Sequence, residues 1–146
     1  MANFKELTVW IIILNFFIMI GAGHGIAPIG LFEISGILQG FGINTEYFSL
    51  SLTASYDKSI SAAALFSLIG QLSLTFSISI KNRKRIFWFK ILGLFFLWTG
   101  FYYISHNLST DNASELGFIF GIPFLICSVI LFYKVILNKN SYLLNE

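Results

Sequence analysis

Apolar stretches long enough to cross a membrane dominate the pattern of hydrophobic and polar positions. Three of them, residues 60–80, 86–104 and 116–137, are separated by polar segments. A fourth, over about 7–25, contains few strongly polar residues. A helix of about 20 apolar residues spans the hydrocarbon core of a bilayer. The pattern therefore predicts an all-α membrane protein, built as a four-transmembrane-helix bundle in one domain over residues 1–146.

The beginning of the chain also has features of a signal peptide. The small residues Gly21, Ala22 and Gly23 follow a short apolar run, as they do before many cleavage sites. The apolar run continues beyond them, however, and reaches the length of a membrane span. This favours a retained anchor over a cleaved leader.

The segment 26–59 is longer than a connection between two spans needs, and we expect it on the outer side of the membrane. Apolar residues recur in it at helical spacing: Leu31, Ile34, Leu38 and Phe41. Pro28 precedes this stripe, and Gly40 and Gly42 mark its end, as is typical of a helix start and stop. We therefore expect a short amphipathic helix at the outer membrane surface or tucked back into it, with Glu33 off the apolar stripe.

Residues 48–54, in the same outer segment, alternate apolar and polar side chains. This period is typical of a strand. A lone strand would leave its backbone groups unpaired. The segment is therefore a strand only where a neighbouring segment or another chain pairs with it, and is otherwise irregular.

Composition narrows the class of protein further. Hydrophobic residues make up 56% of the chain and charged residues 11%, against about 25% charged residues in a soluble domain. The low charge and the 17 Phe residues exclude a soluble enzyme, a disordered chain and a nucleic-acid binder. The single cysteine, Cys127, excludes an intrachain disulfide and a CxxC motif.

The basic residues predict the orientation in the membrane. With four spans, the N-terminus, the 81–85 turn and the C-terminus share one side. That side carries eight of the nine basic residues: Lys5, Lys81, Arg83, Lys84, Arg85, Lys90, Lys134 and Lys139. Positive charge marks the cytoplasmic side, so we expect both termini in the cytoplasm. The Lys- and Ile-rich composition favours a bacterial inner membrane.

Four of these residues, Lys81, Arg83, Lys84 and Arg85, lie in the short turn between the second and third spans. We interpret them as topology determinants, which such a turn requires. The alternative is that the cluster binds anionic lipid head groups.

Small residues mark faces where helices approach closely, because lipid provides no hydrophobic drive between helices. The second span has Ala63, Ser67 and Gly70, and the fourth has the GxxxG pair Gly117 and Gly121. These faces either dock another membrane protein chain or a second copy of this one, or pack inside the predicted bundle. The sequence leaves both interpretations open.

Ionisable residues near the outer side are the candidates for ligand or metal binding: His24, Glu33, His106 and Asp111. Histidines and carboxylates together suit a metal ion or a proton relay. None of the usual metal-binding spacings, such as HxxxH or HExxH, is present. The sequence therefore does not identify a cofactor.

Two uncharged polar residues, Asn15 and Gln71, fall inside the first and second spans. Polar side chains in hydrocarbon seek partners on neighbouring helices, which predicts a packing role. A second hypothesis gives them a ligand: with His24 and Glu33 they would orient the polar end of a lipid, quinone or other hydrophobic solute.

Three functions follow in order of preference. The first is a non-enzymatic subunit or accessory of a membrane protein complex, because catalytic motifs are missing and small-residue faces are present. The second is a binder or transporter of a small hydrophobic ligand. The third is a metal-dependent membrane enzyme. The expected partners are the lipid bilayer and other membrane protein chains, and no nucleic acid.

Overall fold

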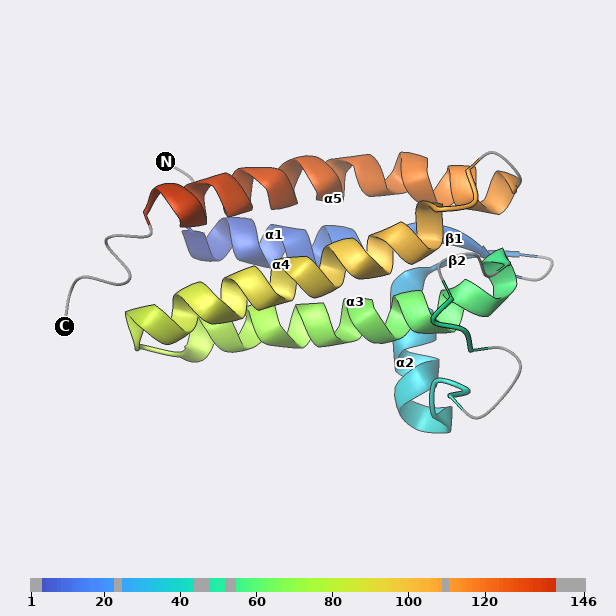
Figure 1. Cartoon of the computed structure of the whole chain (residues 1–146), viewed down its shortest axis with the longest axis horizontal. Helices are drawn as coiled ribbons and strands as arrows, with labels where there is room; N and C mark the ends of the chain where they lie inside the picture. Colours follow the sequence, from blue (N-terminus) through green and yellow to red (C-terminus); the bar gives the residue numbers. More distant parts are fainter. Residues whose placement is uncertain (1–3, 23–24, 44–47, 52–54, 109–110, 139–146) are drawn as a thin grey trace.

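The computed structural model describes residues 4–22, 25–43, 48–51, 55–108 and 111–138. In this part of the chain, five helices accompany one antiparallel hairpin (Figure 1). The elements are, in order, α1 (Phe4–Phe16), β1 (Met19–Ala22), β2 (Gly25–Pro28), α2 (Ile29–Gln39), α3 (Tyr56–Ser79), α4 (Arg83–Ser105) and α5 (Asn112–Leu137).

The helices α3, α4 and α5 are long and apolar enough to cross a membrane. They contain 24, 23 and 26 residues, so each exceeds the ~30 Å of a bilayer core at about 1.5 Å per residue. They lie over the ranges predicted for the last three spans. The prediction of a mostly helical chain with apolar helices suited to a membrane is confirmed to this extent.

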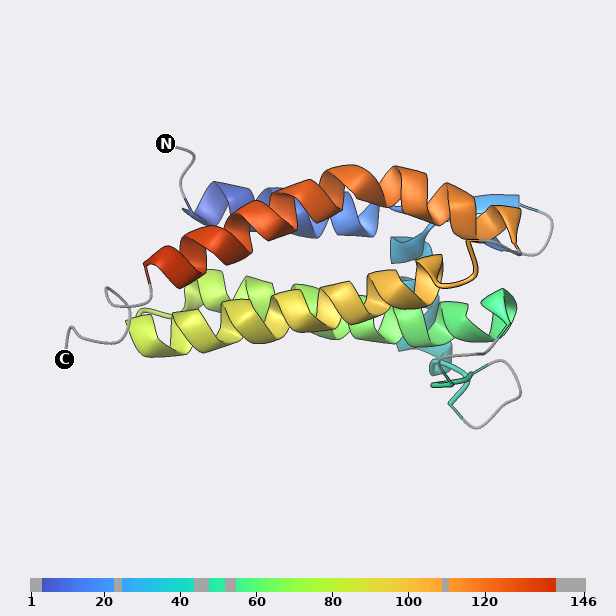
Figure 2. The same ribbon diagram turned by 45° about the horizontal axis from the view of Figure 1, so that its top comes forward.

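The four helices α1, α3, α4 and α5 run along the long axis of the molecule. In Figure 2, α3 lies with α4 and α1 lies with α5. Contacts also join α4 to α5 and α1 to α3, so each helix touches two of the others. The start of α1, the connection from α3 to α4 and the end of α5 lie at one end of the molecule (Figure 1).

The first apolar stretch is not one helix over 7–25. Helix α1 ends at Phe16, and the chain then pairs with itself in the β1–β2 hairpin, from Met19 opposite Pro28 to Ala22 opposite Gly25. The β-branched residues Ile18 and Ile20 are fully buried there. The apolar pattern predicts a helix here, but these residues form a strand, because strand formation depends on packing against residues that are distant in the sequence.

The hairpin packs closely against the first turn of α5. A Cβ atom at Gly21 would lie 2.6 Å from the Cβ of Ala113, so this approach requires glycine. The Gly21 backbone N–H also donates a hydrogen bond to the Tyr56 hydroxyl, at 3.2 Å. The strand is therefore covered by protein on this side.

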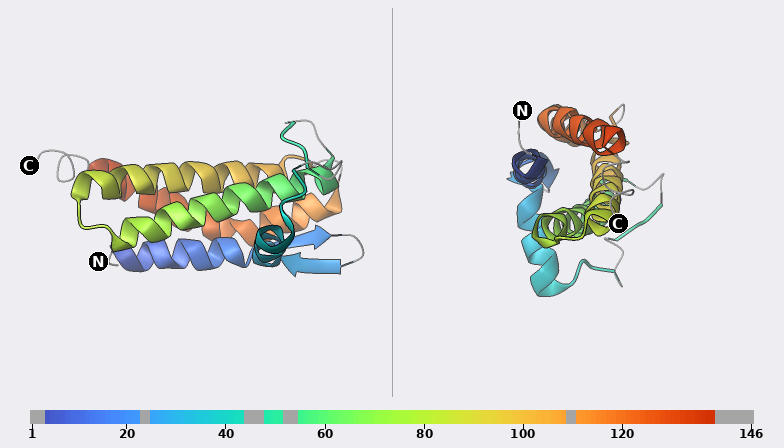
Figure 3. Two further views of the ribbon diagram at one scale, coloured as in Figure 1. Left: turned by 90° about the horizontal axis from the view of Figure 1, so that it is seen from below. Right: turned by 90° about the vertical axis from the view of Figure 1, so that its left-hand side faces the viewer.

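Helix α2 confirms the prediction of a short helix in the outer segment. It begins after Pro28 and ends at Gly40, whose φ of 74° is a left-handed conformation that glycine adopts without strain. It crosses the long helices at a steep angle (Figure 3). Its apolar stripe faces outward, with Leu38 77% exposed, whereas Glu33 is 2% exposed and faces the protein.

The alternating segment after α2 is not a strand where the structure describes it. Residues 48–51 have no regular structure, and residues 52–54 lie outside the described part of the chain. Two hydrogen bonds attach this segment to the long helices. Ser49 N–H donates to the Lys58 carbonyl at 3.0 Å, and the Tyr103 hydroxyl donates to the Leu50 carbonyl at 2.7 Å.

The small residues of α3 pack against α4. A Cβ atom at Gly100 would lie 2.7 Å from Ser67 Oγ and 2.9 Å from the Ala63 carbonyl oxygen. One at Gly70 would lie 2.9 Å from the Gly93 carbonyl oxygen. The predicted face of Ala63, Ser67 and Gly70 thus brings two backbones of this chain together.

The GxxxG pair of α5 is also used within the chain. Gly117 lies directly against Ile104, and Gly121 lies directly against the ring of Phe101, both on α4. All the small-residue positions predicted to pack therefore have a partner inside the molecule.

Candidate functional site

Three polar side chains from three helices meet inside the protein. The side-chain amide of Gln71, on α3, donates one hydrogen bond to Asn15 Oδ1 on α1 and another to Glu33 Oε1 on α2, each at 2.9 Å. A primary amide has two N–H donors, so this nitrogen uses both. We call Asn15, Glu33 and Gln71 the polar junction.

The polar junction is almost completely buried. Asn15 is 0% exposed, Glu33 2% and Gln71 8%. Burial raises the pKa of Glu33, on the non-spanning helix α2, to about 7, and the hydrogen bond from Gln71 opposes this rise. Burying such groups is costly unless they are hydrogen-bonded, so the two bonds stabilise the contact of α2 with the long helices.

One polar atom of the junction has no partner among the described residues. Asn15 Nδ2 is buried and makes no hydrogen bond there. An unsatisfied buried donor costs about 1–3 kcal/mol. The two N–H groups of this nitrogen therefore have no acceptor among the described residues.

Of the four residues predicted as a ligand or metal set, the three that the structure describes, Glu33, His106 and Asp111, are not brought together. His24 lies outside the described part of the chain. Glu33 belongs to the polar junction. His106 ends α4, where its ring Nδ1 lies 3.1 Å from the Tyr103 carbonyl oxygen.

Asp111 has a local role in the connection from α4 to α5. It caps the start of α5, and its carboxylate accepts a hydrogen bond from Ala113 N–H at 2.8 Å. The described residues contain no group of three or more His, Cys, Asp or Glu side chains placed to hold a metal ion. The metal-dependent hypothesis thus gains no support from the described side chains.

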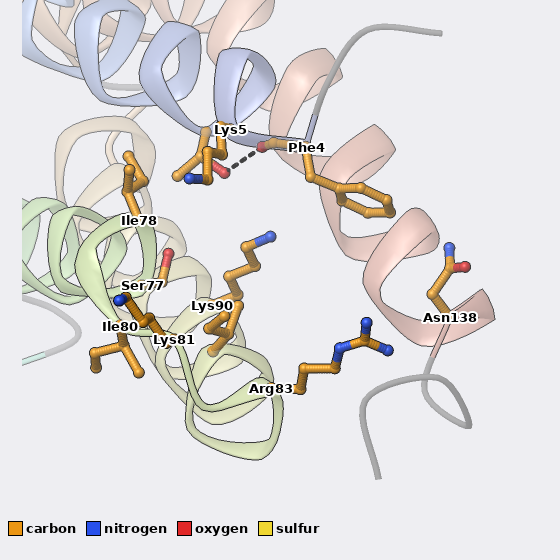
Figure 4. Close-up of a pocket in the computed structure, with 11 residues that line it drawn as sticks. Phe4, Lys5, Ser77, Ile78, Ile80, Lys81, Arg83, Lys90 and Asn138 are labelled. Atoms are coloured by element: carbon orange, nitrogen blue, oxygen red, sulfur yellow. Dashed lines mark hydrogen bonds between the residues drawn. The ribbon is translucent and has the colours of Figure 1, made fainter. Parts of the chain in front are cut away.

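A second feature lies at the end of the long helices where α1 begins and α3 connects to α4. A cavity of about 380 Å³ opens there (Figure 4). Its described lining residues are Phe4, Lys5, Thr8, Ser77, Ile78, Ile80, Lys81, Arg83, Ile86, Lys90 and Asn138. We call it the basic cavity, because four of these residues are cationic and none is acidic.

Two of the four predicted topology determinants line the basic cavity, and the other two do not. Lys81 and Arg83 line it, whereas Lys84 and Arg85 are exposed and are not among the lining residues. The spacing of basic residues in a turn does not reveal which of them border a cavity, because this depends on the residue at which α4 begins.

Lys90 is the lining residue whose position the sequence does not predict. The sequence places it within the apolar stretch 86–104. In the structure it is only 4% exposed, and its Nζ lies 4.9 Å from the centroid of the Phe4 ring. This is within the range of a cation–π contact. In Figure 4, the Lys90 ammonium and the Arg83 guanidinium point into the space between α1, α4 and α5.

No protein family, curated protein or solved structure matches the chain. The geometry of the polar junction and the basic cavity is therefore the basis for the functional argument.

Proposed function

We propose that the chain crosses a bacterial inner membrane four times, as a four-helix bundle with both termini in the cytoplasm. The end of the molecule where α1 begins and α5 ends carries Lys5 and the basic residues of the 81–85 turn, which favours the cytoplasmic side. Helix α1 and strand β1 follow each other along the long axis (Figure 1). At about 1.5 Å and about 3.3 Å per residue, their 13 and 4 residues together match a bilayer core.

This first pass contains non-helical backbone, which a membrane tolerates where protein covers it. The β1–β2 pairing and the contacts of β1 with α5 provide such cover. The hairpin also lies beside the first turns of α5, close to the outer interface of the proposed arrangement.

We further propose that the protein is a non-enzymatic binder of a small hydrophobic ligand, with the polar end of the ligand at the polar junction. Of the four residues that the sequence suggested for this role, Asn15, Glu33 and Gln71 meet directly. The alternative of a complex subunit rested on small-residue faces. Because Gly117 and Gly121 pack against α4, these faces no longer favour an external partner.

The observation that carries this proposal is the buried amide nitrogen of Asn15, which has no partner among the described residues. Its N–H groups need an acceptor oxygen. The neighbouring Glu33 carboxyl group disfavours an anionic ligand. The chemistry therefore suits an apolar molecule that ends in an uncharged carbonyl, ether or hydroxyl oxygen.

Replacement of Asn15 by leucine tests this proposal, because it removes the amide donor at similar size. The protein is purified in a mild detergent, and the small molecules that it retains are extracted and identified by mass spectrometry. We expect the wild type to retain a neutral apolar molecule. The Asn15→Leu variant should retain at least about tenfold less, because a lost hydrogen bond is worth about that factor.

Ser67→Ala is the matched control. Ser67 Oγ is also buried without a partner among the described residues, but it lies at the contact of α3 with α4. This variant should retain the ligand at the wild-type level. A wild-type protein without any retained small molecule, or equal losses in both variants, would contradict the proposal.

A further inference from the structure

We infer that the basic cavity binds the phosphate group of an anionic lipid. This site is separate from the polar junction, and it does not depend on the function proposed there. The two lie at different positions along α3: Gln71 belongs to the polar junction, whereas Ser77 lines the basic cavity.

The cationic side chains come from three parts of the chain. Lys5 lies on α1, Lys81 on the α3–α4 connection, and Arg83 and Lys90 on α4. Among the described lining residues, these four side chains are positively charged and none is negatively charged. The positive charge of this lining attracts an anion more than a neutral molecule, so the arrangement favours an anionic ligand.

The depth of Lys90 strengthens this inference. A surface cluster of basic residues needs no buried member, yet Lys90 lies on an apolar helix and is 4% exposed. Placing an ammonium group at this depth is costly. The contact with the Phe4 ring offsets part of that cost, and the charge remains directed into the cavity (Figure 4).

A phosphate fits these groups better than a carboxylate does. It has more acceptor oxygens, and a guanidinium such as that of Arg83 matches the geometry of phosphate. Apolar side chains lie beside the charges in the same lining: Phe4, Ile78, Ile80 and Ile86. Charged and apolar walls together suit an amphiphile, and basic pockets between membrane helices are typical sites for anionic head groups.

A pair of double variants with equal charge tests the inference. Lys81→Gln with Arg83→Gln removes two cations that line the cavity, and Lys84→Gln with Arg85→Gln removes two from the same turn that do not. All four residues are exposed, so neither change disturbs the buried core. Each protein is placed in phosphatidylcholine nanodiscs that contain phosphatidylglycerol, and retained lipid is counted by native mass spectrometry.

We expect the cavity variant to retain at least about tenfold less phosphatidylglycerol than the wild type, because charge-assisted hydrogen bonds are lost. The control variant should retain nearly the wild-type amount. A Lys90→Met variant should behave like the cavity variant. Equal losses in the two double variants, or no loss in either, would overturn the inference.

Titration with inorganic phosphate distinguishes the source of the phosphate group. If the lipid provides it, a large excess of inorganic phosphate leaves the retained phosphatidylglycerol in place. Free phosphate is the ligand if inorganic phosphate displaces the lipid from the wild-type protein and binds to the wild-type protein but not to the cavity variant. Retention of oleate equal to that of phosphatidylglycerol would overturn the assignment to phosphate.

Discussion

Glu33 shows how the orientation of a single residue can suit a membrane environment. It is the charged residue of α2, and it lies on the face opposite Leu31 and Leu38. A helix packed for water would bury its leucines and expose its carboxylate. In α2 the leucines face outward and Gln71 holds Glu33 inside. This arrangement suits lipid, which accepts apolar side chains and offers no hydrogen bonds to a carboxylate.

The burial of Glu33 predicts that stability falls as the pH rises. Its pKa is about 7 in the folded protein, against an ordinary value of 4.5. Below pH 4.5 the residue is protonated in both states. Between 4.5 and 7 only the unfolded chain loses its proton, so the free energy of unfolding should decrease by up to about 3 kcal/mol and then remain constant.

Thermal unfolding in detergent at a series of pH values measures this effect. Glu33→Gln is the matched control, because the variant keeps an acceptor oxygen for Gln71 and cannot ionise. Its unfolding temperature should vary less with pH than that of the wild type and exceed it above pH 7. Parallel pH curves for the two proteins would show that Glu33 does not titrate in this range.

The contact of α3 with α4 shows how small residues act at the scale of elements. The sequence indicated the small face on α3, but not the residues of α4 that meet it. Gly93 and Gly100 complete the contact, because at both positions a side chain would press on backbone atoms of α3. A glycine in a long apolar helix is a weak signal until its opposing helix is known.

Gly100→Ala should therefore destabilise the protein. The added methyl group would lie within 3.0 Å of the Ala63 carbonyl oxygen, which cannot move without its helix. Overpacking of this kind costs about 1–3 kcal/mol. Thermal unfolding in detergent measures the loss, and we expect a lower unfolding temperature.

Gly25→Ala is the control for this substitution. Gly25 is exposed on β2, and nothing lies within 4 Å of the position of a Cβ atom. Its unfolding temperature should stay at the wild-type value. If Gly100→Ala were equally harmless, the helices would not approach as closely as described.

The arrangement of the whole molecule separates two kinds of polar site. The polar junction joins α1, α2 and α3, and the basic cavity opens at the end where α1 begins and α5 ends. The first is a hydrogen-bonded contact without a lining cation, and the second is lined by four cations. A neutral apolar ligand at one site and an anionic head group at the other are compatible.

The proposed topology predicts which residues a membrane-impermeant thiol reagent reaches. Single cysteines are introduced at Lys5, Lys84 and Leu108 in a Cys127→Ser background. Leu108 is 41% exposed and lies in the α4–α5 connection. In intact cells only Leu108→Cys should be labelled, and the other two should react after lysis.

The Lys5→Cys variant tests the first pass separately. If α1 and β1 together did not cross the membrane, this cysteine would react in intact cells, as Leu108→Cys does. Labelling of Lys84→Cys in intact cells would instead show that the chain has the opposite orientation in the membrane.

The features that depend on length and local composition could be predicted from the sequence. The three long helices follow from apolar stretches of about 20 residues, and α2 follows from its stripe between Pro28 and Gly40. The candidate polar residues Asn15, Gln71 and Glu33 were also recognisable one by one. Each of these signals lies within a few turns of one segment, so no contact partner was needed to interpret it.

Which of these residues meet depends on the packing of the folded chain. Helix α1 ends at Phe16 and β1 pairs with β2, because Ile18 and Ile20 are buried by contacts distant in the sequence. In the fold, Gln71 forms hydrogen bonds with Asn15 and Glu33, which lie 56 and 38 positions before it in the sequence. Lys90 lines a cavity there. Such pairings depend on how whole helices pack, and hydrophobic periodicity within one segment carries no information about them.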